Sequence, residues 1–296
     1  MLSSVKMRWL AAGAVASAAL VAACNTDNMS PHGTPALSRA QADSVGQVMV
    51  SEAQNELDGV TLSGVALGPA MAAPLGPMAD GGLNCVPTFS PTPITDSDSD
   101  RVPDSVRITF PNCAFVEDSS EADTISGSID IIDPTPSVPD RARKMVFTDF
   151  RRVEVEDGRT RSSLVNGARE SVRDANQIVQ SETNFRTAFT FGDGDSATSD
   201  RTWNATFTAD TAGSIRVDAP LPSGTLSVNG TATFTRDTNS FALSVSTNPV
   251  LHYNSGCTTR PKFDAGTFMA TVTKNGATSN VTIAFTACGT FTVTRS

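Results

Sequence analysis

Apolar residues recur at every second position in short stretches of this chain from about residue 85 to its end. Successive residues of a β-strand point to opposite sides, so this alternation places the apolar side chains of a strand on one face. The clearest stretches lie at residues 106–110, 185–191, 203–207, 241–245, 281–285 and 291–293. One buried and one solvated face is typical of antiparallel sheets. The pattern therefore predicts an all-β domain over residues 85–296.

Glycine-containing turn signals separate several of these stretches. They are Asp157-Gly158, Gly192-Asp193-Gly194, Asn229-Gly230 and Asn275-Gly276. Asn-Gly and Asp-Gly pairs favour the tight hairpins whose twist matches that of paired strands. We therefore expect about ten or more strands in an antiparallel meander that forms a sandwich or a strongly curved sheet.

One short N-terminal helix is predicted before the β-rich domain, at residues 37–58. Ser38 and Gln41 form a capping-box pattern at its start, and Asp58-Gly59 gives a stop signal. Between them, apolar residues follow at helical spacing: Val45, Val48, Met49, Ala53 and Leu57. The polar face is not basic, so we expect this amphipathic helix to pack on its own domain. A helix that binds a partner or a membrane surface is the alternative.

The first 23 residues have the features of an export signal. Lys6 and Arg8 supply positive charge, and residues 10–23 form an apolar stretch that is short for a membrane span. The stretch ends in Val21-Ala22-Ala23-Cys24, which resembles the bacterial lipobox. The resemblance implies cleavage before Cys24 and a diacylglycerol on its sulfur, which makes membrane lipid an expected partner. Two or more acyl chains give stable anchoring.

Two segments without a strand or helix pattern follow from this organisation. Residues 24–36 are polar and contain two prolines, so we expect a flexible tether between the lipid and the folded body. Residues 59–84 are rich in Gly, Pro, Ala and Met, which predicts a linker to the β-rich domain. Asn25 is not the aspartate associated with inner-membrane retention of lipoproteins. In an organism with two membranes, the resemblance therefore favours the outer membrane.

Four cysteines follow the lipobox: Cys85, Cys113, Cys257 and Cys288. An even number in an exported chain favours disulfides, although three pairings are formally open. A metal site is the competing interpretation. We consider it weaker, because the chain has no Cys-x-x-Cys and only two histidines.

A short motif that occurs twice favours one of these pairings. Val106-x-Ile108-x-Phe110-x-x-Cys113 matches Val281-x-Ile283-x-Phe285-x-x-Cys288, and each copy has another cysteine at similar range before it. We therefore expect the pairs Cys85–Cys113 and Cys257–Cys288. A closed loop of this size stabilises a fold by roughly 3–4 kcal/mol. The repetition fits either a duplicated unit or two similar solutions to one packing problem.

The strongest candidate for a binding site is the acidic segment Asp96-Ser-Asp98-Ser-Asp100-Arg-Val-Pro-Asp104. It resembles the Asp-rich calcium loops of EF-hand-like and thrombospondin type 3-like repeats. The resemblance implies that Asp96, Asp98, Asp100 and Asp104 bind Ca²⁺, with a backbone carbonyl near Val102 completing the ring. Arg101 departs from the pattern at the turn glycine, and Arg107 stands where an EF-hand has its bidentate acid. A solvated acidic loop without a metal is the alternative.

The charge distribution excludes nucleic acid as an expected partner. The formal net charge is −9, and the leader carries basic but no acidic residues, so the processed chain is more acidic still. Acidic residues dominate positions 96–140, whereas basic residues dominate positions 141–173. This asymmetry fits a docking face or contact with anionic lipid heads. We prefer the solvated face of successive strands as its explanation.

No catalytic motif stands out in the sequence. His252 could join a Ser-His-Asp triad only through space, because no Gly-x-Ser-x-Gly elbow accompanies it. We therefore expect a non-enzymatic, membrane-anchored lipoprotein that acts as a structural or interaction module. The alternative is a carrier that holds a lipid or other apolar ligand in a curved sheet. The sequence names neither a protein partner nor the ligand of such a carrier.

Overall fold

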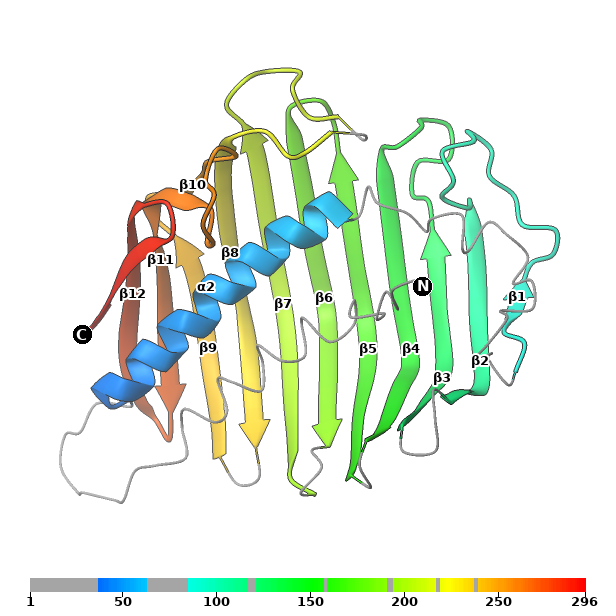
Figure 1. The fold of residues 1–296 in the computed structure, drawn as a ribbon, viewed down its shortest axis with the longest axis horizontal. Coiled ribbons are helices and arrows are strands. Elements are labelled where there is room, and N and C mark those ends of the chain that lie inside the picture. Colours follow the sequence, from blue (N-terminus) through cyan, green and yellow to red (C-terminus); the bar gives the residue numbers. More distant parts are fainter. Residues whose placement is uncertain are drawn as a thin grey trace, which may run out of the picture.

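One broad antiparallel sheet forms most of the molecule, with a single helix lying diagonally across one face (Figure 1). The computed structural model describes residues 37–62, 85–116, 121–156, 159–190, 194–216, 219–236 and 239–296. Helix α2 spans Arg39–Leu62. The predicted leader and tether, with Cys24, and most of the predicted linker lie outside the described residues. Within the described part of the chain, no helix has the length and apolarity needed to cross a membrane.

The sheet has thirteen strands that follow one another almost in chain order. They are β1 (Thr88–Ser90), β2 (Ser105–Val116), β3 (Glu121–Ile132), β4 (Ala142–Glu156), β5 (Arg159–Arg173), β6 (Gln177–Thr190), β7 (Ser196–Ala209), β8 (Gly224–Arg236), β9 (Asn239–Thr247), β10 (Leu251–Tyr253), β11 (Phe263–Lys274), β12 (Ala277–Ala287) and β13 (Thr290–Arg295). The predicted all-β meander is confirmed. All described strands belong to one sheet, so they form no second layer of a sandwich.

Strands β9 and β10 share one position in the sheet. Both pair with β8 on one side and with β11 on the other, at different heights. Asn248-Pro249 separates them. A proline has no N–H to donate to a strand ladder, so it interrupts the strand at this point.

A line of backbone kinks crosses the first half of the sheet. Asn112 in β2, Asp149 in β4 and Asn184 in β6 have positive φ angles of 57°, 46° and 49°, and each lies at a register shift. Gly127 and Gly167, on the intervening strands, have φ angles of 91° and 109°. A Cβ on Gly127 would lie 2.1 Å from the Asp149 carbonyl oxygen. A Cβ on Gly167 would likewise lie 2.3 Å from the Asn184 carbonyl oxygen. Glycine is therefore required on β3 and β5, where the bulges of β4 and β6 approach them.

The same close approach explains one wrong turn prediction. Asn229-Gly230 lies in the middle of β8 and does not form a hairpin. A Cβ on Gly230 would lie 2.4 Å from the Thr202 carbonyl oxygen of β7, so this glycine serves strand packing. Asn275-Gly276, by contrast, forms the predicted turn between β11 and β12, with φ angles of 51° and 79°. Positive angles at both positions are those of a type I′ hairpin.

Helix α2 begins with the predicted capping box. The Ser38 N–H donates to Gln41 Oε1 at 2.7 Å, and the Gln41 N–H donates to Ser38 Oγ at 3.2 Å. The helix continues past Gly59 to Leu62, so Asp58-Gly59 does not end it and the predicted linker begins within it. A single glycine costs a helix only about 1 kcal/mol, which is too little to force a stop.

The apolar stripe of α2 packs on the sheet, as expected for a helix that belongs to its own domain. Val45, Met49 and Ala53 are buried, whereas the side chains of Val48 and Leu57 lie outside the described set. A Cβ on Gly46 would lie 2.6 Å from a methyl group of Val293, so the helix approaches β13 closely at this point.

Two separate apolar clusters lie on the sheet. The first contains the buried residues of α2 together with residues of β6–β13 and the adjoining loops. The second contains no residue of α2 and consists of Val106, Ile108, Ile125, Ile129, Ile131, Phe147, Phe150 and Phe185. We call the side of the sheet that carries α2 the inner face.

The two predicted disulfides are present and stand near opposite edges of the sheet. Cys85 is bonded to Cys113, and Cys257 is bonded to Cys288. The two copies of the repeated motif are β2 and β12, which are each the second strand from an edge. Each copy also carries a register shift just before its cysteine, between Phe110 and Cys113 and between Phe285 and Ala287. Similar positions in the sheet thus accompany the similar sequences.

Candidate functional site

The acidic loop before β2 gathers three of the four aspartates that the calcium resemblance singled out. Carboxylate oxygens of Asp96, Asp98 and Asp100 lie within 4.8 Å of one another. The loop is closed by a hydrogen bond of 2.9 Å from the Asp104 N–H to the Thr95 carbonyl. Carboxylates at this separation repel one another strongly unless a proton or a cation lies among them.

Backbone N–H groups hold these carboxylates in place. Asp96 Oδ2 accepts from the Arg101 N–H at 2.9 Å, and Asp98 Oδ1 accepts from the Asp100 N–H at 3.3 Å. Asp100 accepts from the Val102 N–H at 2.6 Å and from the Asp140 N–H at 2.7 Å. Every carboxylate of the group is therefore oriented by the chain itself.

Asp104 does not join the group. Its carboxylate accepts from the Ser97 N–H at 2.8 Å and from the Ser97 hydroxyl at 2.7 Å. These hydrogen bonds lower the pKa of Asp104. Asp104 thus holds the loop through its hydrogen bonds to Ser97. The resemblance had predicted it to be a calcium ligand.

Asp133, which the sequence did not single out, lies against the loop. It follows β3 directly, and its N–H is bonded to the Pro103 and Asp104 carbonyls at 3.2 Å each. Its side chain is only 4% exposed, and Oδ1 accepts from the Thr135 N–H at 2.8 Å. Only the pairing of Ser105 with Ile132 brings Asp133 here, and a single sequence does not reveal that register.

The remaining oxygens of three carboxylates have no hydrogen-bond partner among the described residues. They are Asp96 Oδ1, Asp98 Oδ2 and Asp133 Oδ2, and all three atoms are buried. Desolvation, followed by repulsion from Asp100, Asp133 and Asp96, raises the pKa of Asp98. Buried carboxylate oxygens without donors are costly, whereas they are the ligands that Ca²⁺ prefers. The group therefore fits a hard cation.

The backbone at Arg101 has the conformation that favours glycine, the residue that the calcium-loop pattern has at this position. Arg101 has a φ angle of +76°, which is the left-handed conformation that a glycine adopts most easily. Arg107 does not face the loop and instead forms a bidentate pair with Asp130 on β3, at 2.6 and 2.7 Å. Arg107 thus offers no acid to the loop. Asp133, directly after the neighbouring strand β3, places a buried acid near it.

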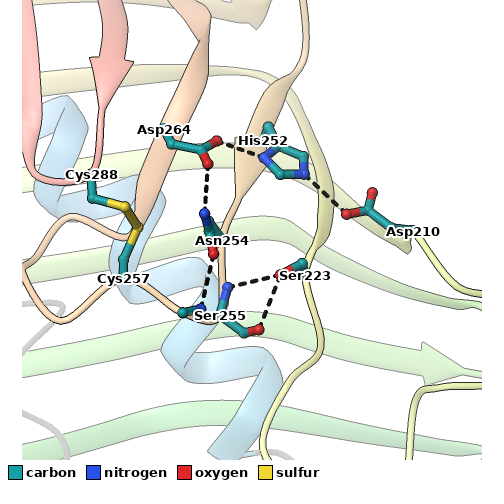
Figure 2. Close-up of polar contacts among 9 residues, drawn as sticks. Asp210, Ser223, His252, Asn254, Ser255, Cys257, Asp264 and Cys288 are labelled. Atoms are coloured by element: carbon teal, nitrogen blue, oxygen red, sulfur yellow. Dashed lines mark hydrogen bonds and ion pairs between the residues drawn. A yellow bond between two sulfur atoms is a disulfide. The ribbon is translucent and has the colours of Figure 1, made fainter.

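His252 is the centre of a second polar cluster, on β10 (Figure 2). Its Nδ1 lies 2.6 Å from Asp264 Oδ1, and its Nε2 lies 3.0 Å from Asp210 Oδ2. Asn254 donates to the other oxygen of Asp264 at 2.8 Å. The two hydrogen-bonded carboxylates raise the pKa of His252 above its ordinary value, Asp264 contributing most.

This second cluster has the geometry of a clamp between three segments of the chain. Both ring nitrogens of His252 face carboxylates, so among the described residues neither faces a serine as a Ser-His-Asp triad requires. The nearby Ser223 and Ser255 hydroxyls pair with each other at 3.0 Å (Figure 2). His252 thus joins β10 to β11 and to the loop that follows β7.

Comparisons with known proteins do not identify a family for this chain. No protein family, no curated protein and no solved structure matches the chain. The functional argument therefore depends on the residues themselves.

Proposed function

We propose that the chain is an exported, lipid-anchored structural or interaction module whose acidic loop is completed by one Ca²⁺ ion. The observation that carries the calcium part is the set of three buried carboxylate oxygens without donors, on Asp96, Asp98 and Asp133. Each of these carboxylates is held by its other oxygen, so the loop loses little entropy when a cation binds.

The export part of the proposal rests on two observations. Two disulfides are typical of proteins outside the cytoplasm. The lipobox-like sequence ending at Cys24 supplies the route and the anchor. Extracytoplasmic calcium reaches millimolar concentrations, which matches the weak affinity of about 10⁻⁴ to 10⁻³ M that is common in extracellular calcium modules.

Thermal unfolding with and without calcium tests the proposal. Millimolar Ca²⁺ should raise the melting temperature of chelator-treated protein. The free energy of unfolding should rise by up to about 2.7 kcal/mol when the calcium concentration is a hundred times the dissociation constant. Asp133→Asn should remove most of this increase. Asp149→Asn, which removes a charge from an exposed bulge on β4, is the matched control and should keep it. Equal responses in the two variants, or no response to calcium, would contradict the proposal.

A second candidate function, the carrier of an apolar ligand, is favoured by the single-layered sheet. A sandwich would bury the apolar face under a second sheet, but all described strands lie in one sheet. Helix α2 contributes only to the first apolar cluster. Around the second cluster, Phe110, Met145 and Val165 are only partly buried. Native mass spectrometry of the Cys24→Ala chain tests this candidate, which predicts a retained apolar molecule and fails if only bare protein is seen.

A further inference from the structure

Four arginines lie on the inner face of the sheet beside the second apolar cluster. Met145 of β4 pairs in register with Arg169, Arg169 with Glu182, and Glu182 with Trp203, which belongs to the cluster under α2. Paired residues of neighbouring strands share a face, so this row belongs to the inner face. The arginine cluster comprises Arg143, Arg169, Arg173 and Arg201.

One buried carboxylate serves two of these arginines. Glu182 is 1% exposed and forms ion pairs with both Arg169 and Arg201. Both guanidinium groups also lie over the Phe185 ring, at 5.5 and 5.1 Å from its centre. Arg173 pairs separately with Asp140 at 3.1 Å. These pairs neutralise two of the four positive charges.

Arg143 has no such partner. No carboxylate of the described chain lies within ion-pair distance of it, and its charged neighbours are Arg169 and Arg173. Burial, followed by repulsion from these two arginines, lowers its pKa. An arginine stays protonated in proteins, so a partly buried one without a counter-charge is unfavourable until an anion binds. The arginine cluster with its two carboxylates thus carries a net charge of +2.

An aromatic row runs from the arginine cluster into the second apolar cluster. Phe185, under the two guanidinium groups, contacts Phe147 at 5.8 Å between ring centres. Phe147 contacts Phe150 at 5.9 Å, and Phe150 contacts Phe110 at 5.8 Å. Positive charge and apolar surface therefore adjoin on one face.

We propose that the inner face binds an anionic amphiphile, with its acidic head at Arg143 and its hydrocarbon chain along the aromatic row. The occupant follows from charge complementarity, because only a ligand with both an anion and an apolar chain satisfies both neighbouring surfaces. This inference rests on the carrier candidate and specifies the class of its ligand. A fatty carboxylate and a phosphate-headed lipid share this chemistry.

Energy transfer from Trp203 to a polyene fatty acid tests the proposal. Trp203 is the only tryptophan among the described residues and pairs in register with Glu182, which places it beside the arginine cluster. The full chain would carry Trp9→Phe, to remove the second tryptophan, and Cys24→Ala, to remove the attached lipid. Dodecanoate, dodecyl phosphate, dodecanol and inorganic phosphate then compete with the probe. The two anionic amphiphiles should displace it, and the alcohol should bind about tenfold more weakly.

Arg143→Met should weaken binding of the anionic amphiphiles about tenfold and leave dodecanol unchanged. Lys144→Met is the matched control, because it removes the same charge from the next residue, which points to the other face and pairs with Glu170 at 3.7 Å. Arg143→Lys should retain binding and guards against a folding defect in the methionine variant. In the unsubstituted site, added salt should weaken binding of dodecanoate but not of dodecanol.

Three results would overturn the proposal. Equal displacement by dodecanol and dodecanoate would indicate a carrier that does not recognise an anion. Displacement by inorganic phosphate as effective as that by dodecanoate would indicate an anion site without a chain. No transfer from Trp203 to the probe, with no displaceable binding, would remove the carrier candidate together with the inference.

Discussion

At the level of single residues, the orientation of each carboxylate matters more to the acidic loop than the number of carboxylates. Asp100 and Asp104 use both of their oxygens as hydrogen-bond acceptors within the chain. Asp96, Asp98 and Asp133 each keep one buried oxygen without a donor. The candidate cation site is therefore the group of Asp96, Asp98 and Asp100, in which Asp96 and Asp98 offer the oxygens without donors. The Asp133 carboxylate lies near Asp98.

Arg101 provides a test of the loop's backbone. Its φ angle of +76° costs a residue with a Cβ roughly 1 kcal/mol, and glycine adopts this angle without that cost. Arg101→Gly should therefore raise the free energy of unfolding by up to about 1 kcal/mol and tighten calcium binding. Arg101→Ala removes the same charge but keeps the Cβ, so it separates strain from charge. Equal effects of the two substitutions in urea unfolding would exclude backbone strain as the cause.

His252 predicts a pH dependence of stability. Its pKa is raised in the folded state, so the clamp stabilises fully below about pH 6.5, and this contribution is lost as pH rises through the raised value. Burial alone would raise the pKa of Asp264, but hydrogen bonds from His252 and Asn254 outweigh it and lower that pKa. The contribution of Asp264 is therefore lost as pH falls through its lowered value.

His252→Gln keeps hydrogen-bonding capacity but cannot take a proton. Urea unfolding from pH 5 to pH 9 should show a stability difference between the two proteins that is largest at the acidic end and shrinks as pH rises. A difference that stays constant over this range would mean that the histidine is not charged in the clamp.

Part of the candidate site could be predicted from the sequence, because calcium loops and disulfides leave local patterns. The grouping of Asp96, Asp98 and Asp100 follows from alternate residues in one tight loop. The presence of Asp133 and the arginine cluster could not be predicted. They depend on strand register, which brings together residues that are distant in the chain and share no local motif.

At the level of strands, the line of kinks distinguishes this sheet from a regular meander. Gly127→Ala would place a Cβ 2.1 Å from a backbone carbonyl of the next strand, at a φ angle of +91°. We expect a loss of about 2–4 kcal/mol of stability, from overpacking together with backbone strain. Gly194 has a φ angle of +93° and nothing within 4 Å, so Gly194→Ala should cost only about 1 kcal/mol. Similar losses in urea unfolding would contradict the packing role.

The sequence predicts the presence of strands better than the positions of the turns between them. Alternation is a direct consequence of one buried face, so the marked stretches all lie largely within strands. The Asn-Gly pairs do not distinguish a turn from a close strand contact, since glycine serves both. Asn275-Gly276 makes a hairpin, whereas Gly230 makes room for β7.

At the level of the whole molecule, the proposed lipid anchor would hold the folded sheet at a membrane surface. Cys24→Ala should abolish lipid labelling and release the protein from the membrane fraction, because the proposed diacylglycerol would be attached through the Cys24 sulfur. Metabolic labelling with a fatty acid, followed by fractionation, measures both effects. Cys85→Ala with Cys113→Ala removes two other cysteines and should leave labelling intact. Unchanged labelling in Cys24→Ala would reject the lipoprotein proposal.

The central claim is that one Ca²⁺ ion binds among the grouped carboxylates of Asp96, Asp98 and Asp100 in the acidic loop. A crystal structure of the protein grown in millimolar calcium tests this claim most directly. We predict one ion bound to Asp96 Oδ1 and Asp98 Oδ2 at about 2.3–2.6 Å. An ordered loop without an ion, in which Asp98 Oδ2 is paired with a protein group, would contradict it.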